Sequence, residues 1–113
     1  MTGLWIIAPV YNEEKNLHSF VEEWMSVFRK VAGNDFTFCL LNDGSTDRSL
    51  SILNELASCY PELRVIDKAN SGHGSTCIAG YELAIQAGAQ WIFQIDSDGQ
   101  CDPMQFRHFW DSR

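Results

Sequence analysis

The sequence has few basic residues, and this shortage limits the partners that the chain can bind. Lys and Arg together number 8, against 15 Asp and Glu, so the formal net charge is −7 at pH 7. A chain without surplus positive charge cannot neutralise many backbone phosphates, which argues against nucleic acid as a general partner. A small phosphate ligand held by a metal ion and backbone amides is still compatible with this charge.

Paired cysteines and long apolar runs are also missing. The four cysteines, Cys39, Cys59, Cys77 and Cys101, form no Cys-x-x-Cys pair. This spacing argues against a zinc site and favours a reducing compartment such as the cytoplasm, with Cys39 as a core residue. The apolar run near the N-terminus covers only about seven residues and lacks a basic flank, so we expect neither a membrane span nor a signal peptide there.

What the sequence does contain is a regular alternation of strand and helix patterns within 113 residues, enough for one domain. Short apolar runs predict four strands, at residues 4–9, 36–41, 63–66 and 91–95. Apolar residues at steps of three and four predict helices at 12–33, 47–60, 76–87 and from Pro103 onward. We expect Asn12 to cap the first helix and Gly33 to end it.

This order predicts an α/β fold. Nearly continuous apolar strands joined by helices indicate a Rossmann-like, mostly parallel sheet of about four strands with helices on both faces. Ligands of such sheets bind beyond the carboxyl ends of the strands. Each expected strand is followed by a polar or glycine-rich segment, in order PVYNEE, NDGSTD, DKANSGHG and DSDGQ. The coincidence of four such loops at one edge predicts a binding site.

The segment DSDGQCDP carries three carboxylates directly after an apolar strand. Asp96, Asp98 and the amide of Gln100 supply the oxygen ligands that Mg²⁺ and Mn²⁺ prefer, so one interpretation is a divalent cation site. The other interpretation is a solvated acidic turn. In either case Asp102 can cap the helix that begins at Pro103.

The other loops also allow two interpretations each. NDGSTD can be only a tight turn and helix cap, but Asp43 is not needed for the turn and can accept a hydrogen bond from a ring N–H. In PVYNEE, Tyr11 can stack on a flat ring. The glycines of NSGHGS do not match a phosphate-binding loop, and we interpret His73 as a loop residue rather than a metal ligand.

The ordered set PVYNEE, NDGSTD and DSDGQCDP closely resembles the donor-binding half of family 2 glycosyltransferases, which are inverting enzymes with the GT-A fold. The D-x-D-x-Q form is most similar to polyprenyl-phosphate sugar transferases such as the dolichyl-phosphate mannose synthases. Each motif alone is weak, whereas the three in this order form a strong resemblance that covers nearly the whole chain.

The resemblance implies a role for each matching position. The residues that it places against a nucleotide-diphosphate sugar are Pro9, Tyr11, Glu13, Leu41, Asp43, Asp96, Ser97 and Asp98. Of these, Leu41 and Asp43 would contact the base, and Asp96 and Ser97 would lie near the ribose and diphosphate. Asp98 and Gln100, together with Asp96, would hold Mg²⁺ or Mn²⁺. The donor would be a UDP- or GDP-sugar, and the acceptor a polyprenyl phosphate or a polysaccharide.

Members of this family continue well past the position of Arg113 and carry their acceptor site and general base in the second half. We therefore expect residues 1–113 to be a donor-binding half without the acceptor half, with little transfer activity alone and no assignable general base. Apolar surface left uncovered predicts self-association. A full-length relative could lie at the membrane surface.

Two alternatives differ from the transferase interpretation. A haloacid-dehalogenase-like phosphatase also places D-x-D-G after a buried strand, with Asp96 as nucleophile, but there the motif follows the first strand rather than the fourth. A non-catalytic nucleotide-binding or assembly module of the same fold would share the motifs without the reaction.

Overall fold

The computed structural model describes residues 3–97 and 102–113. It contains four strands and four helices in strict alternation along these residues. The elements in chain order are β1 (Leu4–Val10), α1 (Leu17–Ala32), β2 (Phe36–Asp43), α2 (Ser49–Cys59), β3 (Leu63–Lys68), α3 (His73–Gln86), β4 (Trp91–Gln94) and α4 (Pro103–Asp111).

The four strands form one parallel sheet in the order β3-β2-β1-β4, which confirms the predicted fold class. The chain moves outward from β1 through β2 to β3 and then crosses back to place β4 on the other side of β1. The strand order therefore reverses between β1 and β4. In open α/β sheets this reversal point is where ligands bind, at the carboxyl ends of the strands.

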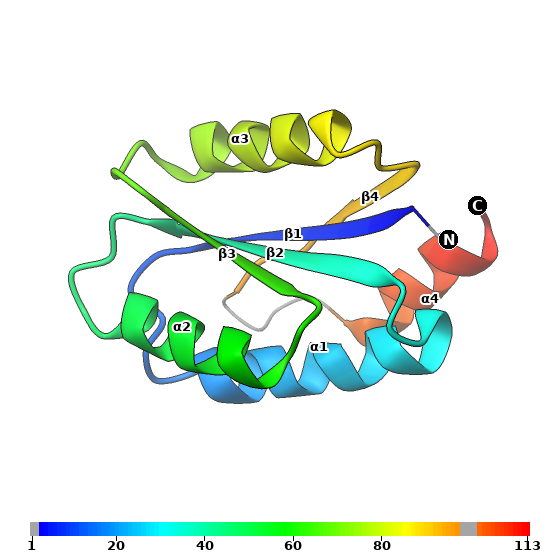
Figure 1. Cartoon of the computed structure of the whole chain (residues 1–113), viewed down its shortest axis with the longest axis horizontal. Helices are drawn as coiled ribbons and strands as arrows, with labels where there is room; N and C mark the ends of the chain where they lie inside the picture. Colours follow the sequence, from blue (N-terminus) through cyan, green and yellow to red (C-terminus); the bar gives the residue numbers. More distant parts are fainter. Residues whose placement is uncertain (1–2, 98–101) are drawn as a thin grey trace.

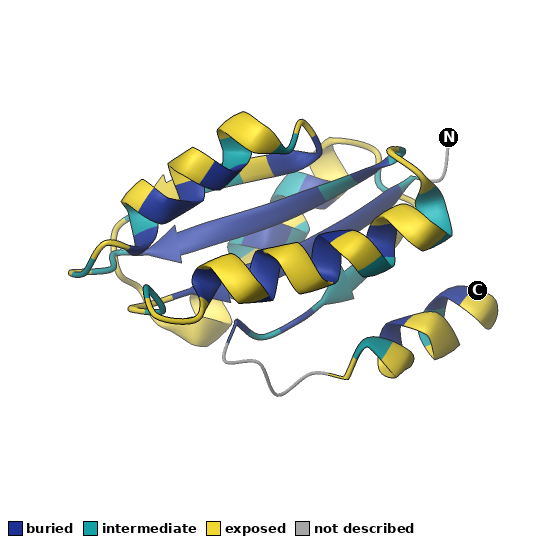
Figure 2. Ribbon diagram, turned by 90° about the horizontal axis from the view of Figure 1, so that it is seen from below, coloured by how far each residue is buried: buried dark blue, intermediate teal, exposed yellow. Residues whose placement is uncertain are grey.

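Helices cover both faces of the sheet (Figure 1), with α3 on one face and α1, α2 and α4 on the other. Alternate residues of a strand point to opposite faces. In β1, Leu4 and Ile6 belong to the core beneath α1, α2 and α4, whereas Trp5 and Ile7 belong to the smaller core beneath α3. Two-sided burial explains why the strands are apolar throughout rather than alternating, and Figure 2 shows them between half-exposed helices.

Aromatic rings form the centre of the larger core. Phe28 of α1 is completely buried, and its ring lies 4.9–5.6 Å from those of Trp24, Phe36, Phe38 and Phe106. Offset and edge-to-face contacts of this kind add to the free energy of apolar burial. Phe28 thus joins α1, β2 and α4 in one cluster.

The first three helices begin at other residues than the sequence predicted, and for α2 the start is Ser49 rather than residue 47. Asn12 does not cap α1, which starts at Leu17 with Asn16 as the N-cap residue. Asn12 instead has a left-handed backbone with φ of 51° and binds another loop. The third helix begins at His73 rather than at residue 76, so the prediction of His73 as a loop residue was also wrong.

Other boundaries are confirmed or shifted by one or two residues, and both α2 and β4 end one residue earlier than predicted. Gly33 ends α1 with φ of 63°, and Asp102 caps α4 by accepting the N–H of Met104 at 2.9 Å. Strands β2 and β3 continue two residues past the predicted ends, because parallel pairing persists where the side chains become polar.

We expect Phe28→Ala to reduce the free energy of unfolding by about 3–5 kcal/mol, because it leaves a cavity at the junction of α1, β2 and α4. Urea denaturation measures this change. As a control, Ile85→Ala removes an apolar side chain that is 67% exposed and should change stability by less than about 0.5 kcal/mol. Equal effects of the two substitutions would contradict the assigned core.

Candidate functional site

The loop that leaves β1 is bound to the loop that leaves β2. The side-chain Oδ1 of Asn12 accepts the backbone N–H of Thr46 at 2.8 Å and that of Asp47 at 3.3 Å. The N–H of Asn12 donates in return to Oγ of Ser45 at 3.0 Å. These bonds join residues more than 30 positions apart, and they hold Asn12 in its left-handed conformation.

Further bonds in the same place extend the connection. The backbone N–H groups of Glu13 and Glu14 donate to Ser49 Oγ at 2.9 Å and Asp47 Oδ2 at 3.2 Å. In the other direction, the N–H of Arg48 donates to Glu14 Oε2 at 3.1 Å. We call this set of contacts between residues 12–14 and 45–49 the loop clasp. It fixes the segment on which Tyr11 and Glu13 lie.

A cavity of about 510 Å³ opens beside the clasp, at the carboxyl ends of the strands. It lies at the point where the strand order reverses, since its walls come from the ends of both β1 and β4. The lining residues are Pro9, Val10, Tyr11, Glu13, Asp43, Asn70, Gly72, His73, Asp96 and Ser97.

Asp43 forms a wall of this cavity with its carboxylate 5% exposed. Oδ1 accepts the backbone N–H of Ser71 at 2.8 Å, and Oδ2 accepts that of Gly72 at 3.1 Å. Burial acts to raise the pKa of Asp43, but the Ser71 N–H and the ammonium of Lys68 outweigh burial and hold the pKa below its ordinary value. Asp43 is therefore an ionised hydrogen-bond acceptor at neutral pH.

On the opposite wall, Asp96 follows the buried Ile95 at the end of β4. Its Oδ1 atom is buried and has no hydrogen-bond partner among the described residues. Nε2 of His73 lies 3.6 Å from this oxygen, and the same nitrogen lies 3.7 Å from Sγ of Cys77. Burial, and then the charge of Asp96, raise the pKa of the Cys77 thiol. A buried carboxylate oxygen that accepts no hydrogen bond is suited to bind a cation.

The structure brings most of the predicted donor residues together at this cavity. Six of them line it, namely Pro9, Tyr11, Glu13, Asp43, Asp96 and Ser97. Leu41 is not among the lining residues, because it is completely buried in the smaller core under α3. Asp98 lies outside the described residues. The roles of all eight in binding a nucleotide stay predictions.

The predicted metal site is described only in part. Asp98 and Gln100 lie outside the described residues, so only Asp96 of the three expected ligands can be placed. Within residues 3–97 and 102–113, no three His, Cys, Asp or Glu side chains are grouped as a metal cluster. The unpartnered Oδ1 of Asp96 nonetheless fits one ligand position of an oxygen-preferring cation.

A larger cavity, of about 820 Å³, lies at the opposite edge of the sheet. Its polar wall is an ion pair in which Arg29 donates to both carboxylate oxygens of Glu62 at 2.8 Å. These two side chains already satisfy each other, and none of the four loop motifs reaches this edge. We therefore assign the candidate site to the smaller cavity.

Sequence reasoning missed several residues of the candidate site. Asn70, Gly72 and His73 line the cavity, and Lys68 binds Asp43 from behind it. All four belong to one segment that was interpreted as a glycine-bearing loop. Its position after a strand, at the same edge as the other motifs, was the available signal.

Comparison with known proteins gives a consistent family. The sequence profile of the family described as "Glycosyl transferase family 2" matches residues 5–112. An undecaprenyl-phosphate 4-deoxy-4-formamido-L-arabinose transferase of Pectobacterium atrosepticum is 36% identical over 101 residues, which cover 87% of this chain. A dolichyl-phosphate beta-glucosyltransferase of Trichomonas vaginalis is 34% identical over 98 residues, 82% of this chain. The chain spans 29% of the length of each of these curated relatives.

Solved structures show the same fold. Residues 1–349 of Staphylococcus aureus TarS superpose with a TM-score of 0.67 at 22% identity, over 94% of this chain and 30% of that one. The structure of the same protein in complex with UDP-GlcNAc also superposes with a TM-score of 0.67, at 23% identity, over 94% of this chain and 29% of that one. Among the described residues, none of the helices has the length and apolar character needed to cross a membrane.

We expect Asn12→Gly to weaken the loop clasp, because glycine accepts the left-handed backbone but removes the side-chain acceptor. The free energy of unfolding should fall by about 1–3 kcal/mol, and the amide protons of Thr46 and Asp47 should exchange faster. Hydrogen exchange and urea denaturation measure both effects. The same substitution at Asn34, an exposed turn residue, is the control. Unchanged exchange at Thr46 in Asn12→Gly would refute the clasp.

The clasp also predicts a dependence of stability on pH. Burial acts to raise the pKa of Asp47, but hydrogen bonds from Ser49 and Glu14 hold it below its ordinary value. Asp47 therefore stabilises the fold above the pKa of an unfolded Asp, about 4, and this contribution is lost as the pH falls through the lower, folded pKa. We expect Asp47→Asn to be less stable than the unaltered chain at pH 7 and to lose less stability on acidification. Parallel stability curves from pH 7 to pH 3 would contradict this.

Proposed function

The chain belongs to glycosyltransferase family 2, and we propose that it binds a nucleotide-diphosphate sugar in the cavity between the ends of β1 and β4 for inverting sugar transfer. The observation that carries the proposal is the convergence of Tyr11, Glu13, Asp43, Asp96 and Ser97 on one cavity at the reversal of strand order. These residues come from three separate loop motifs. If DSDGQ were only a solvated acidic turn, residues of PVYNEE and NDGSTD would have no need to line the same cavity.

Each wall of the cavity offers a different contact to such a donor. Asp43 is an ionised carboxylate and can accept a hydrogen bond from a ring N–H of the base. Tyr11 is half exposed at the mouth, where its ring can stack on the base. Asp96 and Ser97 lie at the other wall, where we place the ribose and diphosphate.

A divalent cation would offset the charges that this arrangement brings together. Glu13, Asp43 and Asp96 all line the cavity, so a diphosphate adds negative charge to a site lined by acidic residues. Asp96, with Asp98 and Gln100, would hold Mg²⁺ or Mn²⁺. When bound, the cation supplies Lewis-acid stabilisation of the diphosphate leaving group.

UDP is the first nucleotide to test, because the TarS neighbour was solved in complex with UDP-GlcNAc. The names of two relatives suggest a polyprenyl phosphate as the acceptor class. The phosphatase alternative loses its basis, since the acidic motif follows β4 rather than the first strand and the chain belongs to another family.

Calorimetric titration of UDP and GDP in the presence of Mn²⁺, and then with EDTA, tests the proposal. We expect UDP to bind only with the metal, and its affinity to fall at least about tenfold in Asp96→Asn and in Asp98→Ala, since each loses a charged ligand. Asp111→Asn removes an exposed carboxylate of α4 and serves as the control. Binding that survives EDTA would contradict the role of the cation, and no binding of either nucleotide would contradict the proposal.

A further inference from the structure

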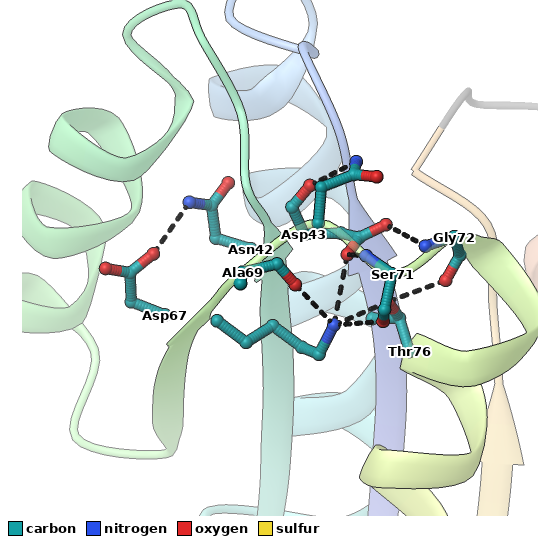
Figure 3. Close-up of polar contacts among 9 residues, drawn as sticks. Asn42, Asp43, Asp67, Ala69, Ser71, Gly72 and Thr76 are labelled. Carbon is teal, nitrogen blue, oxygen red and sulfur yellow. Dashed lines mark hydrogen bonds and ion pairs between the residues drawn. The ribbon is translucent and has the colours of Figure 1, made fainter.

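Lys68 is the last residue of β3, and its side chain turns inward rather than toward solvent. It is paired in register with Asp43 at the end of β2, and its side chain is 20% exposed. The ammonium Nζ lies 3.1 Å from Asp43 Oδ1. It also donates to the carbonyl oxygen of Ala69 at 2.9 Å and to the hydroxyl oxygens of Ser71 and Thr76 (Figure 3). An ammonium has three N–H donors, so these four acceptors are enough to satisfy all of them.

The same contacts bind the segment between β3 and α3 to the end of β2. Besides the N–H groups of Ser71 and Gly72 that reach the Asp43 carboxylate, the side-chain Nδ2 of Asn70 donates to the backbone oxygen of Asp43 at 2.9 Å. Asp43 thus receives hydrogen bonds from three consecutive residues and an ion pair from Lys68. We call residues 69–72 the tethered loop.

The tethered loop has no space to move toward β2. A Cβ atom added at Gly44 would lie 2.6 Å from the backbone N of Asn70, and Gly44 has φ of 63°. Only glycine combines that conformation with so close an approach of two backbones. The turn after β2 and the tethered loop are therefore packed directly against each other.

Lys68 does not line the cavity, but its ion-pair partner Asp43 and two residues of the tethered loop do. Asp43, Asn70, Gly72 and the adjoining His73 form one side of the cavity. Without the ammonium, the buried Asp43 carboxylate would lose its one cationic partner among the described residues and keep neutral donors, namely the two loop N–H groups and the Thr76 hydroxyl. Removing one partner of a buried ion pair leaves an uncompensated charge, which favours rearrangement of the groups around it.

We propose that Lys68 is a positioning residue of the donor site, which holds Asp43 and the tethered loop in the arrangement that receives the base of the nucleotide. This inference rests on the proposed function of the cavity. It adds that recognition of the base depends on the Lys68 ammonium, although that group does not touch the ligand. If Lys68 acted only through its positive charge, it would instead favour binding of the diphosphate.

The test compares Lys68→Met with the unaltered chain in Mn²⁺-dependent binding of UDP and of inorganic pyrophosphate. Loss of a charge-assisted contact predicts a fall of about tenfold or more in UDP affinity. Pyrophosphate affinity should stay within about twofold, because pyrophosphate lacks the base. Lys30→Met, which removes an exposed lysine of α1, is the matched control and should leave both affinities unchanged.

Hydrogen exchange gives a second readout that is independent of nucleotide. The amide protons of Ser71 and Gly72 should exchange faster in Lys68→Met, while those of the loop clasp stay protected. If Lys68→Met does not fold, Lys68→Arg keeps the charge but replaces the compact ammonium by a planar group. We then expect a folded chain with weaker UDP binding and normal pyrophosphate binding.

The outcomes separate this inference from the proposed function. Unchanged UDP affinity in Lys68→Met, or an equal fall for UDP and pyrophosphate, would overturn the positioning role while the donor site stands. Absence of UDP binding by the unaltered chain would overturn the proposed function and this inference with it.

Discussion

The parallel pairing of β1 on both of its edges is the constraint on which the candidate site depends. β2 and β4 both run parallel to β1, so the chain leaves all three strands at the same edge of the sheet. Polar segments that are distant in sequence, after Val10, Asp43 and Gln94, are thereby brought to one place. Since the strand order reverses beside β1, helices on opposite faces diverge there and leave a cavity.

Hydrogen bonds between loops, rather than apolar contacts, determine the shape of that cavity. The loop clasp joins the exits of β1 and β2, and the tethered loop joins the exits of β2 and β3. Both use carboxylate or amide side chains to satisfy backbone N–H groups of the loops, which no strand pairing can satisfy. Asp43 and Asp47 have lowered pKa values for this reason, and they keep their charge where burial alone would favour protonation.

The sequence predicted the features that depend on local pattern. Apolar runs identified all four strands, and Asp102 before Pro103 identified the start of α4, because capping involves residues two positions apart. The edge of the sheet that carries the site also followed from the pattern, since parallel strands must end together.

The sequence did not predict features that depend on distant partners. Asn is a residue type that often caps helices, but the side chain of Asn12 accepts a hydrogen bond from the backbone of Thr46, 34 positions away. Lys68 finds Asp43 only through the register of β2 with β3, which no local pattern reveals. The family resemblance implied that Leu41 contacts the base, yet Leu41 packs in the core under α3.

Paramagnetic broadening by Mn²⁺ in the presence of UDP tests the location of the site most directly. With isotopically labelled protein, the account predicts that the amide signals of Tyr11, Asp96 and Ser97 broaden first, at the carboxyl edge of the sheet. The signals of Thr37 and Leu63, beside the larger cavity, should stay sharp. Broadening centred on Thr37, Leu63 and the carboxylate of Glu62 would place the cation at the opposite edge and contradict the account.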